Sequence, residues 1–133
     1  VLGGIMFAPL LTQDNGGLSI EEIQEKIKTD DDHCAISKML SLENTHQGRV
    51  LDVNEVSTLA SCGHKNGLSV HLDGARLMNA IVKLNVDPKA IVANVDSVSL
   101  CLSKGLGTPA GSVLSGSAEF IKKAKRIRKL LGG

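Results

Sequence analysis

Lys104 is the first residue of this sequence whose surroundings suggest chemistry. It follows residues 96–103, which alternate small and apolar side chains in the manner of a buried strand. Gly105 and Gly107 come after it and leave the backbone uncrowded. Apolar surroundings remove solvent from an ammonium group and favour the neutral amine, which is a nucleophile. The pattern therefore predicts a reactive lysine at the end of a buried strand.

A second group of polar side chains follows another predicted strand. Because side chains alternate along a strand, His71 and Asp73 lie on the same side of it. Arg76 falls in the first turn of the helix that we predict to come next. The carboxyl ends of parallel strands meet at one edge of the sheet, where open α/β sheets bind ligands. We therefore expect Asp73, Arg76 and Lys104 to meet at that edge.

An amine and a carboxylate that face each other across a crevice suit pyridoxal phosphate. A lysine can form a Schiff base with the aldehyde of this cofactor, and a carboxylate can keep its pyridine nitrogen protonated. A nearby arginine can hold a substrate carboxylate with two hydrogen bonds. Each residue also has a plainer interpretation when taken alone: Asp73 as a helix N-cap, Arg76 as a surface residue and Lys104 as a solvated loop lysine. Their combination favours a cofactor site.

Strands and helices alternate along the chain and supply the frame for these residues. Hydrophobic patterns and turn residues predict strands at 35–43, 68–72, 95–102 and 110–115, and either a strand or a loop at 1–11. Helices are predicted to follow the capping residues Ser19, Asp52 and Ser117, and also at 74–84 and 88–93. This alternation indicates an α/β fold with a mostly parallel sheet flanked by helices. The link from Lys104 to Ala110 is too short for a helical crossover, so the last strand is expected to run antiparallel to its neighbour or to lie apart from it.

Length and composition limit the possible function classes. A chain of 133 residues has room for one modest core, so we expect a single domain over residues 1–133. The net charge of +1 provides no overall field for nucleic acid or a membrane surface, and no apolar run reaches the roughly 20 residues of a membrane-spanning helix. The three cysteines form no CxxC pair, which favours reduced thiols and a cytoplasmic location. The start at Val1 and the scarcity of aromatic residues suggest an internal piece of a longer protein.

Other patterns have weaker claims. Residues 105–110 fit the dinucleotide fingerprint G-x-G-x-x-A, but the residues that follow do not open a helix. Residues 122–129 are basic and could contact nucleic acid or a membrane, although the apolar stripe of the same helix favours a solvated outer face. His71 and Asp73 could hold a metal as H-x-D, but no other histidine has the spacing of a metal site, and we expect none. His46 is either a loop histidine with no role or a contact near the substrate.

Four segments together resemble the threonine aldolases, which are fold-type I pyridoxal-phosphate enzymes. The two stretches already described, residues 71–80 and 96–107, carry most of the resemblance. Residues 42–46 (Leu-Glu-Asn-Thr-His) and residues 126–133 match the same family upstream and downstream of them. The matching segments span residues 17–133 in the family's order, so the combination is far more specific than a single lysine.

The resemblance implies a function and a role for each site residue. Lys104 would carry the cofactor as a Schiff base, Asp73 would pair with the pyridine nitrogen, and Arg76 would bind the substrate carboxylate near the cofactor. The reaction would be carbon–carbon cleavage of a small β-hydroxy amino acid, L-threonine or L-allo-threonine, to glycine and acetaldehyde. Family members form tetramers. The chain would be the incomplete central part of the large cofactor domain, and the alternative is a catalytically inactive fragment or splice form of such an enzyme.

Overall fold

The computed structural model describes residues 3–133, and nine helices and strands lie in that range. Residues 3–11, where a strand or a loop was expected, form no strand, and the first two residues of that segment lie outside the description. The helices and strands follow one another in this order: α1 Ile20–Lys26, β1 Met39–Glu43, α2 Val53–Lys65, β2 Ser69–Gly74, α3 Leu77–Leu84, α4 Pro88–Val92, β3 Ser97–Cys101, β4 Ser112–Gly116 and α5 Ala118–Leu130.

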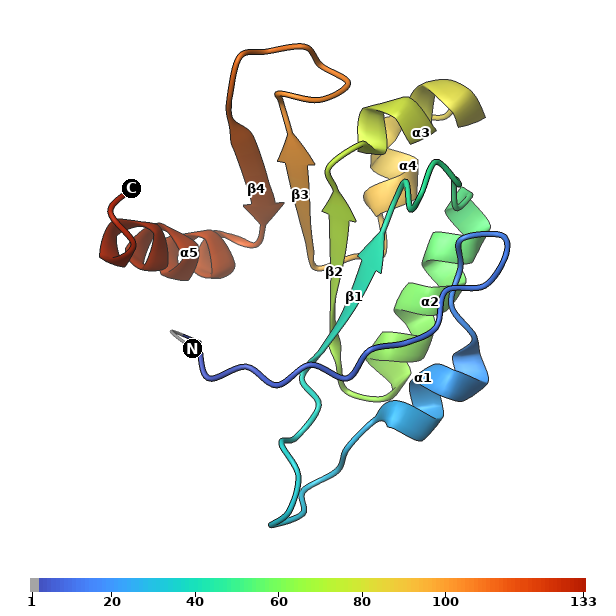
Figure 1. The fold of residues 1–133 in the computed structure, drawn as a ribbon, viewed down its shortest axis with the longest axis vertical. Helices are drawn as coiled ribbons and strands as arrows, with labels where there is room; N and C mark the ends of the chain where they lie inside the picture. Colours follow the sequence, from blue (N-terminus) through green and yellow to red (C-terminus); the bar gives the residue numbers. More distant parts are fainter. Residues whose placement is uncertain (1–2) are drawn as a thin grey trace.

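The four strands form one sheet in the order β1-β2-β3-β4 (Figure 1). β1, β2 and β3 run parallel, and β4 runs antiparallel to β3. The antiparallel alternative for the last strand is confirmed, because the ten-residue link 102–111 turns the chain straight back along β3. The mostly parallel α/β sheet is confirmed as well.

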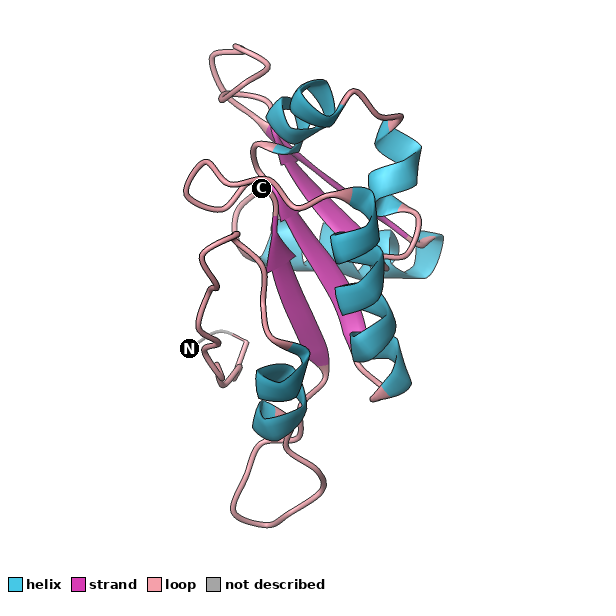
Figure 2. Ribbon diagram, turned by 90° about the vertical axis from the view of Figure 1, so that its right-hand side faces the viewer, coloured by secondary structure: helices cyan, strands magenta, loops and turns pink. Residues whose placement is uncertain are grey.

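One face of the sheet is covered by helices and holds the core. Two crossovers connect β1 to β2 and β2 to β3 and advance in the same direction across the sheet, so their right-handed sense puts α2, α3 and α4 on the same face. Figure 2 shows α2 lying lengthwise along the strands. A Cβ placed on Gly63 of α2 would come within 2.8 Å of the Val70 side chain, so this helix packs closely on β2. The largest buried apolar side chains are those of Leu42, Val56, Val70, Leu72 and Ile91.

The opposite face of the sheet carries small and polar side chains. His71, at the centre of this face, is half-buried, and its Nδ1 lies 2.8 Å from Ser97 Oγ on the neighbouring strand. Burial lowers the pKa of His71, and the nearby Asp73 carboxylate opposes this shift more weakly. Met39 on β1 is largely exposed. Within residues 3–133 no helix covers this face.

Capping side chains start the helices at the predicted positions. Asp52 and Glu55 form a complete capping box at the start of α2, each accepting a hydrogen bond from the backbone N–H of the other. Ser19 accepts from Glu22 N at the start of α1, but Glu22 bonds Leu11 N instead of returning to the cap. That second bond attaches the N-terminal segment to α1.

Three element predictions need correction. The strand predicted from residue 35 begins only at Met39, because residues 35–38 have no partner strand and Ser37 bonds Lys28 instead. The helix predicted from Gly74 begins at Leu77, since Gly74 still belongs to β2. β3 is half-buried, not buried, after Ser97.

Asp96 lies just before the amino end of β3, whereas Lys104 follows the carboxyl end of the same strand. Its Oδ2 accepts a hydrogen bond from Val70 N at 2.6 Å and lies 2.9 Å from His64 Nε2. Both contacts lower the pKa of Asp96. The pair joins the end of α2 to the starts of β2 and β3.

No helix within residues 3–133 has the length and apolar character needed to cross a membrane.

Candidate active site

The site residues predicted from the sequence lie at or shortly after the carboxyl ends of β2 and β3, which are neighbours in the sheet (Figure 1). Glu43 is the direct partner of Asp73 across β1 and β2, and Asp73 is the direct partner of Ser99 across β2 and β3. β3 ends at Cys101, three positions before Lys104. The parallel register therefore sets an acidic and hydroxyl-bearing row at the edge where a ligand is expected.

Asp73 is half-buried, and one of its two carboxylate oxygens is engaged locally. Its Oδ1 accepts a hydrogen bond from Ala75 N at 2.9 Å and a long one from Ser99 Oγ at 3.5 Å. The first bond holds the turn between β2 and α3. Asp73 is thus not the N-cap of α3, which is Arg76. This arrangement fixes the carboxylate at the strand end and leaves its Oδ2 without a hydrogen bond to any residue in 3–133.

Lys104 lies in the turn that follows β3, and its surroundings differ from the prediction. The turn is closed by a hydrogen bond from Gly107 N to Lys104 O at 2.9 Å. Lys104 is exposed, so the desolvated surroundings expected for its amine are not found. The turn packs against α3, because a Cβ on Gly105 would lie 2.2 Å from Asn79 Oδ1. The chain then leads into β4 and not into a helix, which rules out the dinucleotide fingerprint.

The thiol of Cys101, at the end of β3, is influenced by two nearby cations. A hydrogen-bond contact with Ser103 Oγ at 3.3 Å is the main cause that lowers the pKa of the Cys101 thiol. The positive charges of Lys104 and Arg76 lower this pKa further. Arg76 and Lys104 are both exposed, and neither forms a salt bridge with a residue in 3–133. The influence of both charges on Cys101 indicates that Arg76 and Lys104 lie near the end of β3.

Sequence reasoning missed the side-chain contacts that close the loop at the end of β1. Asn44 is fully buried, and its side chain donates to Leu51 O at 2.9 Å and accepts from Leu51 N at 3.2 Å. His46, which the sequence offered only as a loop histidine or a substrate contact, contacts the Glu43 carboxylate through Nδ1. The only signal for this pair was the spacing of three residues between a strand-end glutamate and a histidine.

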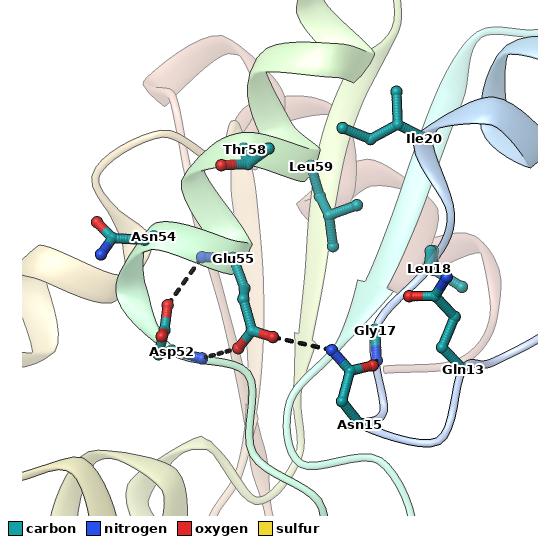
Figure 3. A pocket seen from close by; sticks show the side chains of 10 residues that line it. All are labelled: Gln13, Asn15, Gly17, Leu18, Ile20, Asp52, Asn54, Glu55, Thr58 and Leu59. Atoms are coloured by element: carbon teal, nitrogen blue, oxygen red, sulfur yellow. Dashed lines mark hydrogen bonds between the residues drawn. The ribbon is translucent and has the colours of Figure 1, made fainter.

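A hollow lies elsewhere in the described part of the chain (Figure 3). It has a volume of about 270 Å³ and separates the turn 13–17 from the start of α2. Its carboxylates belong to the capping box, and Glu55 Oε1 also accepts a hydrogen bond from Asn15 Nδ2 at 3.0 Å. Asp73, Arg76 and Lys104 do not line this hollow. We interpret it as a structural gap bridged by the capping box.

A second hollow, of about 230 Å³, adjoins the loop at the end of β1. Polar residues of two segments line it: Thr12, Gln13, Asp14, Gly16, His46, Gln47 and Arg49. Of the two hollows, this one is lined by His46, a residue of the loop at the carboxyl edge. In the part of the chain that the structure describes, no group of three His, Cys, Asp or Glu side chains is arranged to hold a metal ion.

Comparisons with known proteins agree with the resemblance. The chain is 44% identical over 133 residues to the low specificity L-threonine aldolase of Escherichia coli K12, covering all of this chain and 40% of that protein. It is 42% identical over 137 residues to the probable low-specificity L-threonine aldolase 2 of Arabidopsis thaliana, covering 99% of this chain and 39% of that protein. The chain thus spans about two fifths of the length of these relatives.

Solved structures and a family model give the same result. A crystal structure from Listeria monocytogenes EGD-E, provisionally named an L-allo-threonine aldolase, matches with a TM-score of 0.77 at 29% identity, over 94% of this chain and 34% of that one. The likeness confirms the predicted fold as part of a fold-type I pyridoxal-phosphate enzyme. The family model described as Beta-eliminating lyase matches residues 1–133. On this match over its whole length, the chain belongs to the beta-eliminating lyase family.

Proposed function

We propose that this chain is the central part of a carbon–carbon lyase that uses pyridoxal phosphate to cleave L-threonine or L-allo-threonine to glycine and acetaldehyde. The observation that supports the proposal is that Asp73 lies at the carboxyl end of β2 and Lys104 follows the neighbouring strand β3, where the charges of Lys104 and Arg76 both act on Cys101. The names of the similar proteins from E. coli and A. thaliana supply the choice of substrate.

The residues at this edge include the amine and the carboxylate that pyridoxal phosphate uses. Lys104 is exposed and forms no salt bridge with a described residue, so its amine is accessible to an aldehyde. Asp73 is held by Ala75 N through one oxygen only, and its other oxygen can accept a hydrogen bond from a protonated ring nitrogen. When bound, the cofactor supplies an electron sink for the substrate's α-carbon when the Cα–Cβ bond breaks.

The chain's own residues then bind and orient the substrate. Arg76 would hold the amino-acid carboxylate, because its guanidinium reaches the end of β3 and has no acidic partner among residues 3–133. Asp73 would keep a proton on the ring nitrogen of the cofactor. The polar row of Asp73 and Ser99 leaves this edge small and hydrophilic, which suits a short β-hydroxy amino acid.

Three further expectations remain part of the proposal. The described residues would belong to a single cofactor-binding domain over residues 1–133, and the whole protein would form a tetramer. A cytoplasmic location rests on the thiols, since Cys34, Cys62 and Cys101 are all free.

Covalent labelling tests the proposed role of Lys104. The chain is mixed with pyridoxal phosphate, reduced with borohydride and digested, and the labelled lysine is identified by mass spectrometry. We expect the label on Lys104, because this residue is exposed and follows the carboxyl end of β3, the strand next to that of Asp73. Lys104→Ala should lose most of the label, whereas Lys129→Ala, at the end of α5, should keep it.

The same experiment separates the lyase from the alternative of an inactive fragment. Label spread evenly over the lysines of α5 would show that the chain has no cofactor site of its own. Label on Lys104 without release of acetaldehyde from either threonine isomer would show a cofactor-binding but inactive piece. Release of acetaldehyde by the loaded protein, lost in Lys104→Ala, would support the full proposal.

A further inference from the structure

The loop at the end of β1 is held more firmly than an ordinary connection. The buried Asn44 side chain closes its base through two hydrogen bonds to the backbone of Leu51. At its tip, His46 and Arg49 exchange two backbone hydrogen bonds of 3.1 and 2.8 Å. Gln47 and Gly48 between them both have positive φ angles, of 47° and 79°. These constraints fix the position of the His46 backbone at the carboxyl edge.

The Glu43 carboxylate fixes the ring of the same residue. Its Oε2 contacts His46 Nδ1, and the two side chains are 43% and 28% exposed, so the ring is largely shielded. An ionised carboxylate can only accept hydrogen bonds. His46 Nδ1 must therefore carry the proton of this contact, and in a neutral ring Nε2 is then without one.

We propose that Glu43 is a positioning residue that holds His46 with Nδ1 protonated and Nε2 bare at the carboxyl edge of the sheet. This inference rests on the proposed function, because cleavage of a β-hydroxy amino acid requires a group that takes the proton of the hydroxyl. A bare imidazole nitrogen is such a group, and a protonated one is not.

The location of the pair supports this assignment. Glu43 is the direct strand partner of Asp73, so the pair stands beside the residue that we propose for the cofactor nitrogen. His46 also lines the polar hollow of about 230 Å³. A histidine that served the loop alone would not need its ring held, since Asn44 and the tip hydrogen bonds already close the loop.

Nitrogen NMR of the histidine rings tests the inference without any cofactor. The chain is labelled with ¹⁵N-histidine and recorded at about pH 9, well above the ordinary titration range of imidazole. We expect the His46 signals of a protonated Nδ1 and a bare Nε2. Glu43→Ala should lose this pattern and move toward the Nε2–H form, whereas Glu43→Gln, which keeps an acceptor oxygen, should retain it. Glu119→Ala removes an exposed carboxylate of α5 and should change nothing at His46.

The wild-type spectrum is decisive by itself, whatever the stability of the variants. A protonated Nε2 in the wild-type chain would overturn the assignment, and so would a Glu43→Ala variant that kept the wild-type pattern. Because no cofactor is present, failed labelling of Lys104 would overturn the proposed function and leave the result on Glu43 standing.

Discussion

At the scale of single residues, the packing of Gly105 decides where Lys104 stands. A Cβ on Gly105 would lie 2.2 Å from Asn79 Oδ1 and 3.1 Å from Asn79 Cγ, well inside van der Waals contact. Gly107, two positions on, has no neighbouring atom within 4 Å of its hypothetical Cβ, although its φ of 70° is unfavourable for other residues. The turn is therefore seated on α3 by the absence of a side chain at position 105.

We predict that Gly105→Ala destabilises the chain by at most about 1 kcal/mol and lowers labelling of Lys104, because the added methyl group must displace the exposed Asn79 side chain from the turn. Urea unfolding and the labelling assay measure the two effects. Asn79→Ala, combined with Gly105→Ala, should restore both, since it removes the clashing atoms. Gly107→Ala should cost about 1–2 kcal/mol from backbone strain alone, and Asn79→Ala should not rescue it. Equal rescue of both variants would contradict the clash.

The site residues differ in how far the sequence could place them. The alternation of β2 and the common edge of parallel strands are properties of the sequence pattern, so the places of Asp73 at the end of β2 and of Lys104 shortly after β3 were predictable. The exposure of Lys104 was not, because solvent access depends on segments far from it in sequence. The ring contact between Glu43 and His46 depends on a loop that is closed by a side chain seven residues from its partner, a spacing with no recognisable pattern.

At the scale of elements, helix starts that depend on a local capping side chain were predicted correctly. Boundaries that depend on contacts with other segments were not. Ser19, Asp52 and Ser117 cap helices through their own side chains, and all three were identified. Residues 35–38 resemble the start of a strand, yet Ile36 is 42% exposed, because no neighbouring strand extends that far. The start of α3 was missed because Asp73 bonds Ala75 N and prolongs the turn after β2.

His71 lies on the helix-free face of the sheet, and its lowered pKa should make the stability of the folded chain sensitive to acid. Burial lowers the pKa of His71 in the folded chain below the ordinary 6.5. At a pH between the lowered pKa of the folded chain and the ordinary pKa of the unfolded chain, the unfolded chain binds more protons than the folded one. The free energy of unfolding therefore falls as the pH is lowered below about 6.5. The stabilising contribution of the neutral ring is fully present only above that pH.

We predict that His71→Gln unfolds with a weaker pH dependence than the wild type between pH 7.5 and 5, because the glutamine does not titrate. Urea midpoints at a series of pH values in that range measure the difference. His33→Gln, in an exposed loop, is the matched control and should follow the wild-type curve. A His71→Gln curve parallel to that of the wild type would show that another group carries the acid sensitivity.

At the scale of the whole molecule, the helix-covered face and the β4 end differ in how complete they are. The core under α2, α3 and α4 is dense, with Ala60, Val70, Leu72 and Ala80 wholly buried. At the other end, every residue of β4 is exposed, and α5 has no buried residue. Figure 1 shows α5 standing away from the helices that cover the sheet. The described residues therefore include a packed part under the helices and a β4–α5 part whose apolar side chains face solvent.

The exposed edge of β4 leads to a prediction about association. Within residues 3–133 β4 pairs only with β3, so its outer backbone groups are available to another strand. Val113 and Leu114 on this strand are 46% and 40% exposed, so pairing would bury apolar surface as well as satisfy hydrogen bonds.

We predict that the chain associates with increasing concentration in sedimentation experiments and that Val113→Lys weakens association at least several-fold, because a charged side chain at an edge strand opposes pairing. Ser61→Lys, which adds the same charge on the exposed side of α2, should leave it unchanged. A wild-type chain that stays monomeric at high concentration, or equal effects of the two lysine variants, would show that the β4 edge does not drive association.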